Sequence, residues 1–564
     1  MKNVVFLPLL LVLSVSVARG EGPADALLKL VPPDAGAVLA VEDLREHART
    51  VMDSPLVKKL RGLPAVKAWL GGDGLVKLKT ARRDVEAALG VDVSRLRDDL
   101  LGEALVLVLQ PGQDGEPEGP PSGLLLLKVR DRELLDRLIA LVNESDRRNG
   151  TLERVERRTK GETAYSVRRF RPGTKPDEAY AVLDGDVFAW SNSEALIQGV
   201  IDRQGGAPGL GDDPRLISVR AALPNKALAS LFVNPRFLER HLAADPSSAL
   251  LRRTLAAVEY AGVALDWRDG PQIQVHQTLD PAKLSDLWKR GTSRPGDVND
   301  LATRVPATAL ALAAGSVDLA ALVKILSSLV PEAEQAKVDN LQNLARGLLL
   351  GRDPRTDVLK GVGPGVLSYV EAPVGPENQW RLPVIVALGV DSGVSAALDN
   401  ALRTVLAMLA LDPKRSAGSV RVETRTIQGV AVTTLSGPRP PLAFALKDGR
   451  LIVGTTPKAV AAALTAKSGS NTRFAQIQSA YFPKAENFAY VDLDAVHRWA
   501  KNHRAELVRQ LTKGKEDVSA RDLDQALALL GLFRAGYLTS AIGPESTSIH
   551  MIIELIESTT QATE

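Results

Sequence analysis

The chain of 564 residues contains no cysteine. This absence excludes disulfide bonds, thiolate nucleophiles, cysteine-ligated zinc and a lipidated amino-terminal cysteine. A chain of this length is long enough for two to four domains with sizeable cores, so it can be stable without disulfides even outside the cytoplasm.

Aromatic residues and net charge are also scarce. Phe, Trp and Tyr make up 4% of the chain, too few to favour a platform of stacked rings for single-stranded nucleic acid. Lys and Arg number 70 against 67 Asp and Glu, a formal net charge of +3. Such a near balance is not an electrostatic signature of nucleic-acid binding. We therefore expect no nucleic-acid partner.

Long apolar runs are missing except at the amino terminus. Lys2 precedes an apolar stretch, Val4 to Val17, and Ser16-Val17-Ala18 is a small-residue cleavage signal. The run is shorter than the roughly 20 residues of a membrane helix. Residues 1–20 are thus predicted to be a cleaved signal peptide. We expect an exported protein, periplasmic or extracellular, with no transmembrane segment after cleavage.

Two stretches of the chain follow the same order of features, Ala181 to Ile197 and Ala443 to Val460. Each has an apolar strand, an Asp-Gly pair, a second apolar strand and a helix. Asp-Gly suits a two-residue hairpin turn because Gly accepts positive φ without a Cβ clash. In the second stretch Thr456 and Pro457 are typical of a helix N-cap and first position.

Other landmarks recur at nearly the same offset. Leu89-Gly90-Val91-Asp92 and Leu350-Gly351-Arg352-Asp353 lie 261 residues apart, and so do the strand-preceding Gly102 and Gly363. This regularity predicts an internal duplication. We expect a signal peptide at residues 1–20, a first lobe at 21–290 and a linker at 291–304. A second lobe at 305–557 and a disordered tail at 558–564 would follow.

Strand and helix patterns alternate within each half. Asp or Asn stands at four strand-to-helix junctions, where it can cap the first helical turn: Asp43, Asn234, Asp318 and Asp492. Residues 159–167 and 422–434 each predict a strand that crosses a glycine, and 272–277 and 548–553 alternate as half-exposed strands do. The pattern predicts an α+β protein of two homologous lobes. Each would have a mixed or antiparallel sheet with helices mainly on one face.

These motifs resemble an uncharacterised family of exported bacterial proteins, a domain of unknown function. The residues concerned are the proline-strand-Val-Asp-Leu formula ending at Leu493, the Leu-Gly-x-Asp motif before a strand, and the Asp-Gly-strand-Thr-Thr-Pro run ending at Pro457. The resemblance implies an envelope or secreted location. It implies no activity and no catalytic residues.

The sequence contains only weak matches to metal-binding and phosphate-binding motifs. No two of the six histidines have the spacing that would place both on one metal ion from the same helix. The run Gly361-Val362-Gly363-Pro364-Gly365 lacks the Lys-Ser/Thr ending of a phosphate-binding loop. Acidic clusters at Asp92, Asp98 and Asp99, and at Asp353 and Asp357, lack the spacing of a calcium loop and are interpreted as caps and turns. We expect no metal and no cofactor.

The densest basic run contains Arg157, Arg158, Arg168 and Arg169, with glutamates interleaved. One interpretation is a solvated face with weak ion pairs. The sharper hypothesis is an anion-binding surface for an envelope polymer or phospholipid head groups.

Three functions remain open. The first is a non-enzymatic interaction or scaffold module of the cell envelope, with an anionic polymer or another envelope protein as partner. The second is a hydrolase with a carboxylate site in a groove between the lobes. The third is a periplasmic binder or chaperone for apolar ligands, which would need a large apolar sheet face left uncovered. Catalytic residues cannot be assigned, and the first function is preferred.

Overall fold

The computed structural model describes residues 22–64, 85–110, 122–237, 255–267, 270–284, 304–316, 335–373, 382–411, 421–436, 442–466, 487–512 and 519–556, with a few single residues and short runs between these ranges. The expected signal peptide, the tail 558–564 and all but two residues of the expected linker 291–304 lie outside them. In the described part of the chain, no helix has the length and apolar character to span a membrane.

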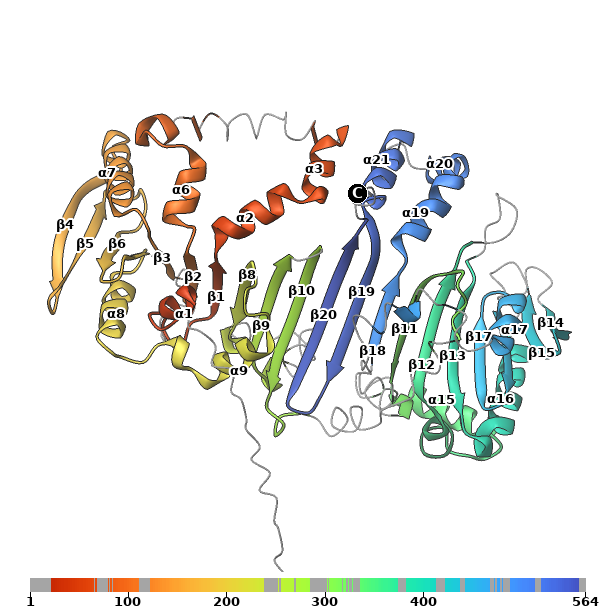
Figure 1. The fold of residues 1–564 in the computed structure, drawn as a ribbon. Coiled ribbons are helices and arrows are strands. Elements are labelled where there is room, and N and C mark those ends of the chain that lie inside the picture. The colour runs from red at the N-terminus through yellow and green to blue at the C-terminus, as the bar shows by residue number, and fades with distance from the viewer. Residues whose placement is uncertain are drawn as a thin grey trace, which may run out of the picture.

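Strands dominate both halves of the chain (Figure 1). Those of the first half are β1 (Ala37–Glu42), β2 (Ala104–Gln110), β3 (Ser122–Lys128), β4 (Leu152–Lys160), β5 (Thr163–Phe170), β6 (Glu178–Leu183), β7 (Val187–Ser191), β8 (Ala229–Val233), β9 (Val258–Trp267) and β10 (Pro271–Leu279). Those of the second half are β11 (Ala309–Ser316), β12 (Val362–Glu371), β13 (Val384–Val390), β14 (Arg421–Ile427), β15 (Val430–Ser436), β16 (Leu442–Lys447), β17 (Arg450–Gly454), β18 (Asn487–Val491), β19 (Phe533–Ile542) and β20 (Ser546–Leu555).

The two halves arrange their strands in the same order. From the outer edge inward, the first half runs β4-β5-β6-β7-β3-β2-β1-β8-β9-β10. The second runs β14-β15-β16-β17-β13-β12-β11-β18-β19-β20. Every one of these described pairs is antiparallel, which fits the expected α+β class.

The halves join edge to edge through β10 and β20, whose ladder runs from Gln272 opposite Ile552 to Thr278 opposite Ser546. The described strands therefore form one 20-stranded sheet. We expected a separate sheet in each of two lobes, and that expectation was wrong. The two alternating segments would each leave a row of unpaired backbone groups at an edge, and pairing with each other satisfies both.

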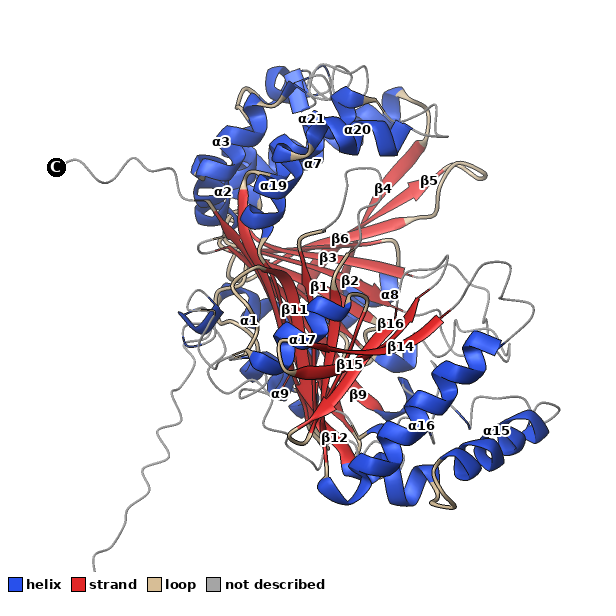
Figure 2. Cartoon of the chain, turned by 90° about the vertical axis from the view of Figure 1, so that its right-hand side faces the viewer, coloured by secondary structure: helices blue, strands red, loops and turns tan. Residues whose placement is uncertain are grey.

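Helices cover both faces of the outer strands (Figure 2). On one face lie α1 (Pro23–Leu28), α8 (Glu194–Gln204) and α9 (Pro214–Ala222), and in the second half α17 (Pro457–Thr465). On the other lie α6 (Val93–Leu100), α7 (Arg132–Arg148) and α16 (Ser392–Leu411). In β3, Leu126 packs in the core with α1 and α8, whereas Leu125 and Leu127 pack on the other face with α6 and α7. The expectation of helices mainly on one face was thus wrong.

Six more α-helices are described. They are α2 (Leu44–Asp53), α3 (Pro55–Gly62), α15 (Gln335–Leu348), α19 (Leu493–Asn502), α20 (Arg504–Thr512) and α21 (Ala520–Leu530). Figure 1 shows α2, α3 and α19 to α21 along the upper edge of the sheet. The junction caps behave as predicted at Asp492, which accepts from the backbone N–H of Ala495 at 2.8 Å, and at Asn234, which accepts from that of Arg236 at 3.1 Å. The prediction was wrong at Asp43, whose side chain makes no capping hydrogen bond and whose φ is 47°.

The glycine turns differ in detail from their prediction. Asp448 and Gly449 form the expected two-residue turn, with φ of 51° and 69°. The first-half counterpart has three residues, Asp184 to Asp186, because Leu183 pairs with Val187. Gly161 and Gly429 do not lie inside single strands, since each is part of a tight hairpin, β4–β5 and β14–β15.

Candidate functional site

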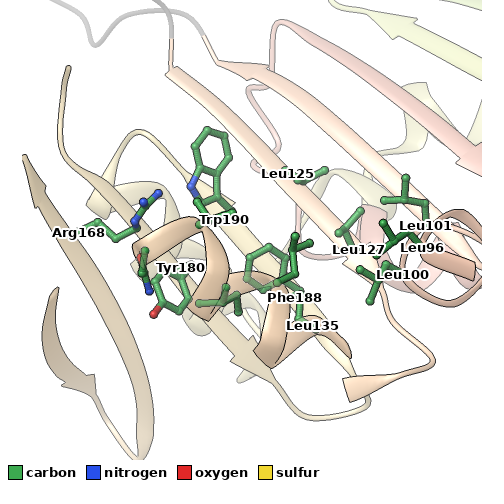
Figure 3. A pocket seen from close by; sticks show the side chains of 14 residues that line it. Leu96, Leu100, Leu101, Leu125, Leu127, Leu135, Arg168, Tyr180, Phe188 and Trp190 are labelled. Carbon is green, nitrogen blue, oxygen red and sulfur yellow. The ribbon is translucent and has the colours of Figure 1, made fainter. Parts of the chain in front are cut away.

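A cavity of about 360 Å³ lies between the sheet and helices α6 and α7 in the first half (Figure 3). Nearly all of its lining is apolar. It comprises Leu96, Leu100, Leu101, Leu125, Leu127, Leu135, Leu138, Ile139, Val142, Asn143, Arg168, Tyr180, Phe188 and Trp190. We call it the apolar pocket.

Strand alternation builds the floor of the apolar pocket. Leu125 lies opposite Trp190 and Leu127 opposite Phe188, and Trp190 in turn lies opposite Tyr180. Directly opposed residues of neighbouring strands point to the same sheet face. The floor is therefore a surface of large rings and leucines across β3, β7 and β6.

The roof of the apolar pocket is one face of α7. Leu135, Leu138, Ile139 and Val142 recur at the three- and four-residue spacing that places side chains on one side of a helix. The start of α7 is held by Asp131, whose carboxylate accepts from the backbone N–H of Leu134 at 2.9 Å. Arg95 of α6 also donates to Asp131, at 3.0 Å, and so ties the two roof helices together.

A cluster of charged side chains borders one end of the apolar pocket. Arg168 of β5 is 5% exposed, and its Nη1 and Nη2 donate to Glu178 of β6 and Asp146 of α7. Trp190 Nε1 donates to the same Glu178 at 3.3 Å. Lys175 lies 3.3 Å from Asp146 and 3.4 Å from Glu178. These two cations and two carboxylates clamp the end of α7 onto the sheet, and we call them the Arg168 cluster.

Opposing effects act on the pKa of Asp146. Burial alone would raise it, but the hydrogen bonds and charges of Lys175 and Arg168 outweigh burial and hold the pKa below its ordinary value. The carboxylate of Asp146 therefore stays ionised near neutral pH.

Two buried polar atoms at this end have no hydrogen-bond partner among the described residues. They are Nε of Arg168 and Oδ1 of Asn143, and both residues line the apolar pocket. Figure 3 places Arg168 and Trp190 at one end of the lining and the leucines of α6 at the other. The surface of the cavity is thus almost entirely apolar, and the charged side chains border it at one end.

Beyond the helices, the pocket floor continues as an exposed apolar row across the sheet. Side chains opposite one another in the ladder run through Trp190, Leu125, Leu107, Leu39, Leu231, Val263, Val275 and Ile549. Leu107, Leu231 and Ile549 are 43%, 39% and 41% exposed. With strands about 4.8 Å apart, this row is roughly 34 Å long. Among the described residues, these partly exposed side chains form an apolar sheet surface of the kind that the binder hypothesis requires.

The four arginines of the predicted anion-binding surface lie in different surroundings. Arg168 is buried in its cluster. Arg158 bridges Glu156 and Glu194, and Arg169 pairs with Asp177. Arg157 is exposed, has no ion pair among the described residues, and lines a polar hollow of about 640 Å³ that adjoins the apolar pocket at Tyr180 and Ile139.

The acidic clusters act as caps. Asp92 accepts from the backbone N–H of Arg95 at 2.8 Å, and Asp353 accepts from those of Arg355 and Thr356. The Thr356 N–H, then Arg346, lower the pKa of Asp353 to about 2. Within the described ranges, no three histidine or acidic side chains converge as metal ligands would.

The hydrolase hypothesis required converging carboxylates between the lobes. The halves meet there through a backbone ladder between β10 and β20. Burial raises the pKa of Glu371 on β12, but the polar contact described for it is the hydroxyl of Thr308, 3.5 Å away. A two-carboxylate mechanism needs a second acid within reach. Among the described residues, no second carboxylate is recorded beside Glu371.

Comparison with known proteins adds one finding. Residues 97–348 match a family model described as a protein of unknown function, DUF3352. The match confirms the resemblance to a family of unknown function, and the matched stretch contains every residue that lines the apolar pocket except Leu96. No curated protein and no solved structure matches the chain.

Sequence reasoning missed the apolar pocket. Its floor comes from strands that are distant in sequence, and only their pairing brings Leu125 and Trp190 together. The available signal was Arg168 itself, a charged residue that alternates with the apolar Val167 in a strand pattern. Such a residue can face inward when it has acidic partners.

Proposed function

We propose that this protein is an exported, non-enzymatic protein that binds the apolar part of a small amphiphilic molecule in the apolar pocket. This develops the third hypothesis, a binder of apolar ligands. Export rests on the amino-terminal pattern at residues 1–20.

The observation that carries the proposal is an apolar cavity that borders a charged cluster at one end. Small-molecule sites are concave, mostly apolar, and carry a few polar groups that orient the ligand. A volume of about 360 Å³ lies at the lower end of the range for such sites. The exposed apolar row beside it offers further contact area to a longer chain.

We also propose that the two halves arose by duplication and that the first half became specialised. Support comes from the shared strand order and the 261-residue offset. Register places Leu435 and Leu442 where the first half has Arg168 and Glu178. The charged cluster beside the pocket therefore distinguishes one half from the other, as a site acquired by one copy would.

The experiment is binding of the uncharged fluorescent dye N-phenyl-1-naphthylamine to the purified protein. Leu138→Trp adds a large ring to the pocket roof, and Leu344→Trp adds the same ring on α15, where Leu344 is 51% exposed. We expect the first variant to lose at least about tenfold in dye affinity and the second to keep it. Equal binding by both variants, with unchanged melting curves, would contradict the proposal.

A second candidate is an electrostatic contact with anionic envelope material through Arg157, which is exposed and has no ion pair among the described residues. Its test is co-sedimentation with purified envelope at low and high salt, comparing wild type with Arg157→Gln. Salt-reversible binding that weakens in the variant would support this contact. Binding that does not change with salt would contradict it.

A further inference from the structure

We propose that the ligand of the apolar pocket places a zwitterionic head group in the adjoining polar hollow, with its anionic part next to the apolar chain and its cationic part at the outer end. A phosphocholine or phosphoethanolamine head has this order. The inference rests on the proposed function, because it names the ligand class of the same site. The groups that select the head are Arg157, Ser166 and Tyr180 on the inner side, and Glu162 and Asp184 on the outer side.

The polar hollow forms where β5 and β6 separate. Their ladder ends at Tyr165 opposite Ala181, although both strands continue for two more residues, 163–164 and 182–183. Those four residues line the hollow of about 640 Å³, whose surface is mainly polar, unlike that of the apolar pocket. A head group in this hollow therefore meets accessible polar atoms.

A single cross-strand row links the polar hollow to the apolar pocket. Arg157 lies opposite Ser166, which lies opposite Tyr180. Tyr180 in turn lies opposite Trp190 on the pocket floor. Opposed residues point to the same sheet face, so the row passes from rings to a hydroxyl and then to a guanidinium over three strand spacings, roughly 14 Å. Tyr180 and Ile139 line both cavities, so a molecule that fills both lies across these two side chains.

The inner end of the polar hollow offers hydrogen-bond donors to an anion. The guanidinium of Arg157 is exposed and has no ion pair among the described residues. In the same part of the chain, no hydrogen bond is described for the hydroxyls of Ser166 and Tyr180, which also line the hollow. Guanidinium N–H groups match the oxygens of a phosphate in geometry and charge. A phosphate attached to a chain in the apolar pocket would therefore lie beside three donors.

Two carboxylates lie at the outer end of the polar hollow. Glu162 is four residues from Ser166 toward the β4–β5 turn, and Asp184 is four residues from Tyr180 along β6. Since β5 and β6 are antiparallel, both steps run in the same direction, about 14 Å along the strands. Neither carboxylate has an ion pair among the described residues. A cationic group at this end would compensate their charge.

Charge balance decides that the head is zwitterionic. The other charged residues of the hollow wall, Arg132 and Asp136, pair with each other at 3.5 Å. A purely anionic head would leave Glu162 and Asp184 uncompensated, and a purely cationic head would leave Arg157 so. The order of the two charges follows from the row, because Arg157 belongs to the row that leads to the apolar pocket and the carboxylates lie beyond it.

The test is displacement of N-phenyl-1-naphthylamine from the purified protein by two ligands with the same ten-carbon chain, both below their micelle-forming concentrations. Decylphosphocholine has its phosphate next to the chain and its ammonium outermost. Decyldimethylammoniopropanesulfonate, a sulfobetaine, has the reverse order and the same net charge. We expect decylphosphocholine to bind at least about tenfold more tightly, because the sulfobetaine would place like charges together at both ends.

Variants of the polar hollow test the assignment of each charge. Arg157→Gln removes the cation that faces the phosphate, and Glu162→Gln with Asp184→Asn removes the carboxylates that face the ammonium. Each change should reduce the preference for decylphosphocholine. Arg171→Gln is the matched control, because Arg171 is also exposed, has no ion pair among the described residues and lines neither cavity. The control should keep the full preference, and an unchanged preference in the Arg157→Gln variant would overturn the inner site.

Each outcome of the displacement test separates the two claims. Equal affinities of the two ligands for the wild type, or tighter binding of the sulfobetaine, would overturn the head-group assignment and leave the proposed function standing. Bound dye that neither ligand displaces would also overturn the assignment, because chain and head would then not share one site. Failure of the dye itself to bind would overturn the proposed function and this inference with it.

Discussion

Nδ1 of His276 lies 2.7 Å from the hydroxyl of Ser548. His276 is on β10 and Ser548 on β20, directly opposite each other in the ladder that joins the two halves. The imidazole is 9% exposed, and burial lowers its pKa. The central joint of the sheet thus contains a buried histidine that is preferentially neutral.

Stability should therefore fall in mild acid. The ordinary pKa of 6.5 describes His276 in the unfolded chain, and the folded pKa is lower. The unfolded state then binds more protons, so this contribution to stability is complete above about pH 6.5 and decreases as pH falls below it. We expect His276→Gln to reduce the decrease in melting temperature between pH 7.5 and pH 5.5. His47→Gln on α2 is the control, and an identical decrease in both variants would exclude His276 as the cause.

Replacing Arg168 should destabilise the protein strongly. Arg168→Met leaves Asp146 and Glu178 without their shared cation, and breaking a buried ion pair typically costs about 3–5 kcal/mol. The measurement is the free energy of unfolding in urea. Arg157→Met removes an exposed guanidinium from the neighbouring strand and should change that energy by about 0.5 kcal/mol or less. Similar losses of unfolding free energy in the two variants would contradict a stabilising role of the Arg168 cluster.

The hairpin between β14 and β15 can be improved. Its turn consists of Gln428 and Gly429, with φ of 52° and 78°. Gln is strained in this left-handed conformation, whereas Asn-Gly is the preferred pair. Gln428→Asn should raise the free energy of unfolding by roughly 0.5–1 kcal/mol. Gly429→Ala should lower it by about 1 kcal/mol, because Ala disfavours positive φ. Thermal melting of both variants is the measurement. Melting temperatures equal to that of the wild type would show that the turn is not strained.

The exposed apolar row should account for most dye binding outside the pocket. The double variant Leu107→Ser, Leu231→Ser removes two half-exposed leucines from it at a stability loss of about 1 kcal/mol or less per site. We expect lower fluorescence of 8-anilinonaphthalene-1-sulfonate with the folded protein. Ile217→Ser on α9 removes an isoleucine that is 51% exposed and lies away from the row. An equal decrease in that control would show that the row is not a preferred surface.

Local patterns in the sequence predicted most of the elements. The periodicity around residues 133–142 predicted the core of α7, and the alternation at 272–277 and 548–553 predicted β10 and β20. The cap at Asp492 and the turn at Asp448-Gly449 form as expected, because caps and tight turns depend on a few adjacent residues. The candidate site could not be found in this way. Arg168 was grouped with Arg157, Arg158 and Arg169 by proximity in sequence, although only the pairing of β5 with β6 decides which of them is buried.

Backbone preferences over a few residues were enough to predict most of the strands and several of the turns and caps. The sequence by itself also indicated the repeated order of the two halves. Tertiary structure alone decided that β10 pairs with β20, that helices cover both faces of the outer strands, and that Arg168 meets Asp146, Glu178 and an apolar cavity. These contacts join residues far apart in the chain, and their free energy comes from burial and charge pairing that exist only after the sheet has formed.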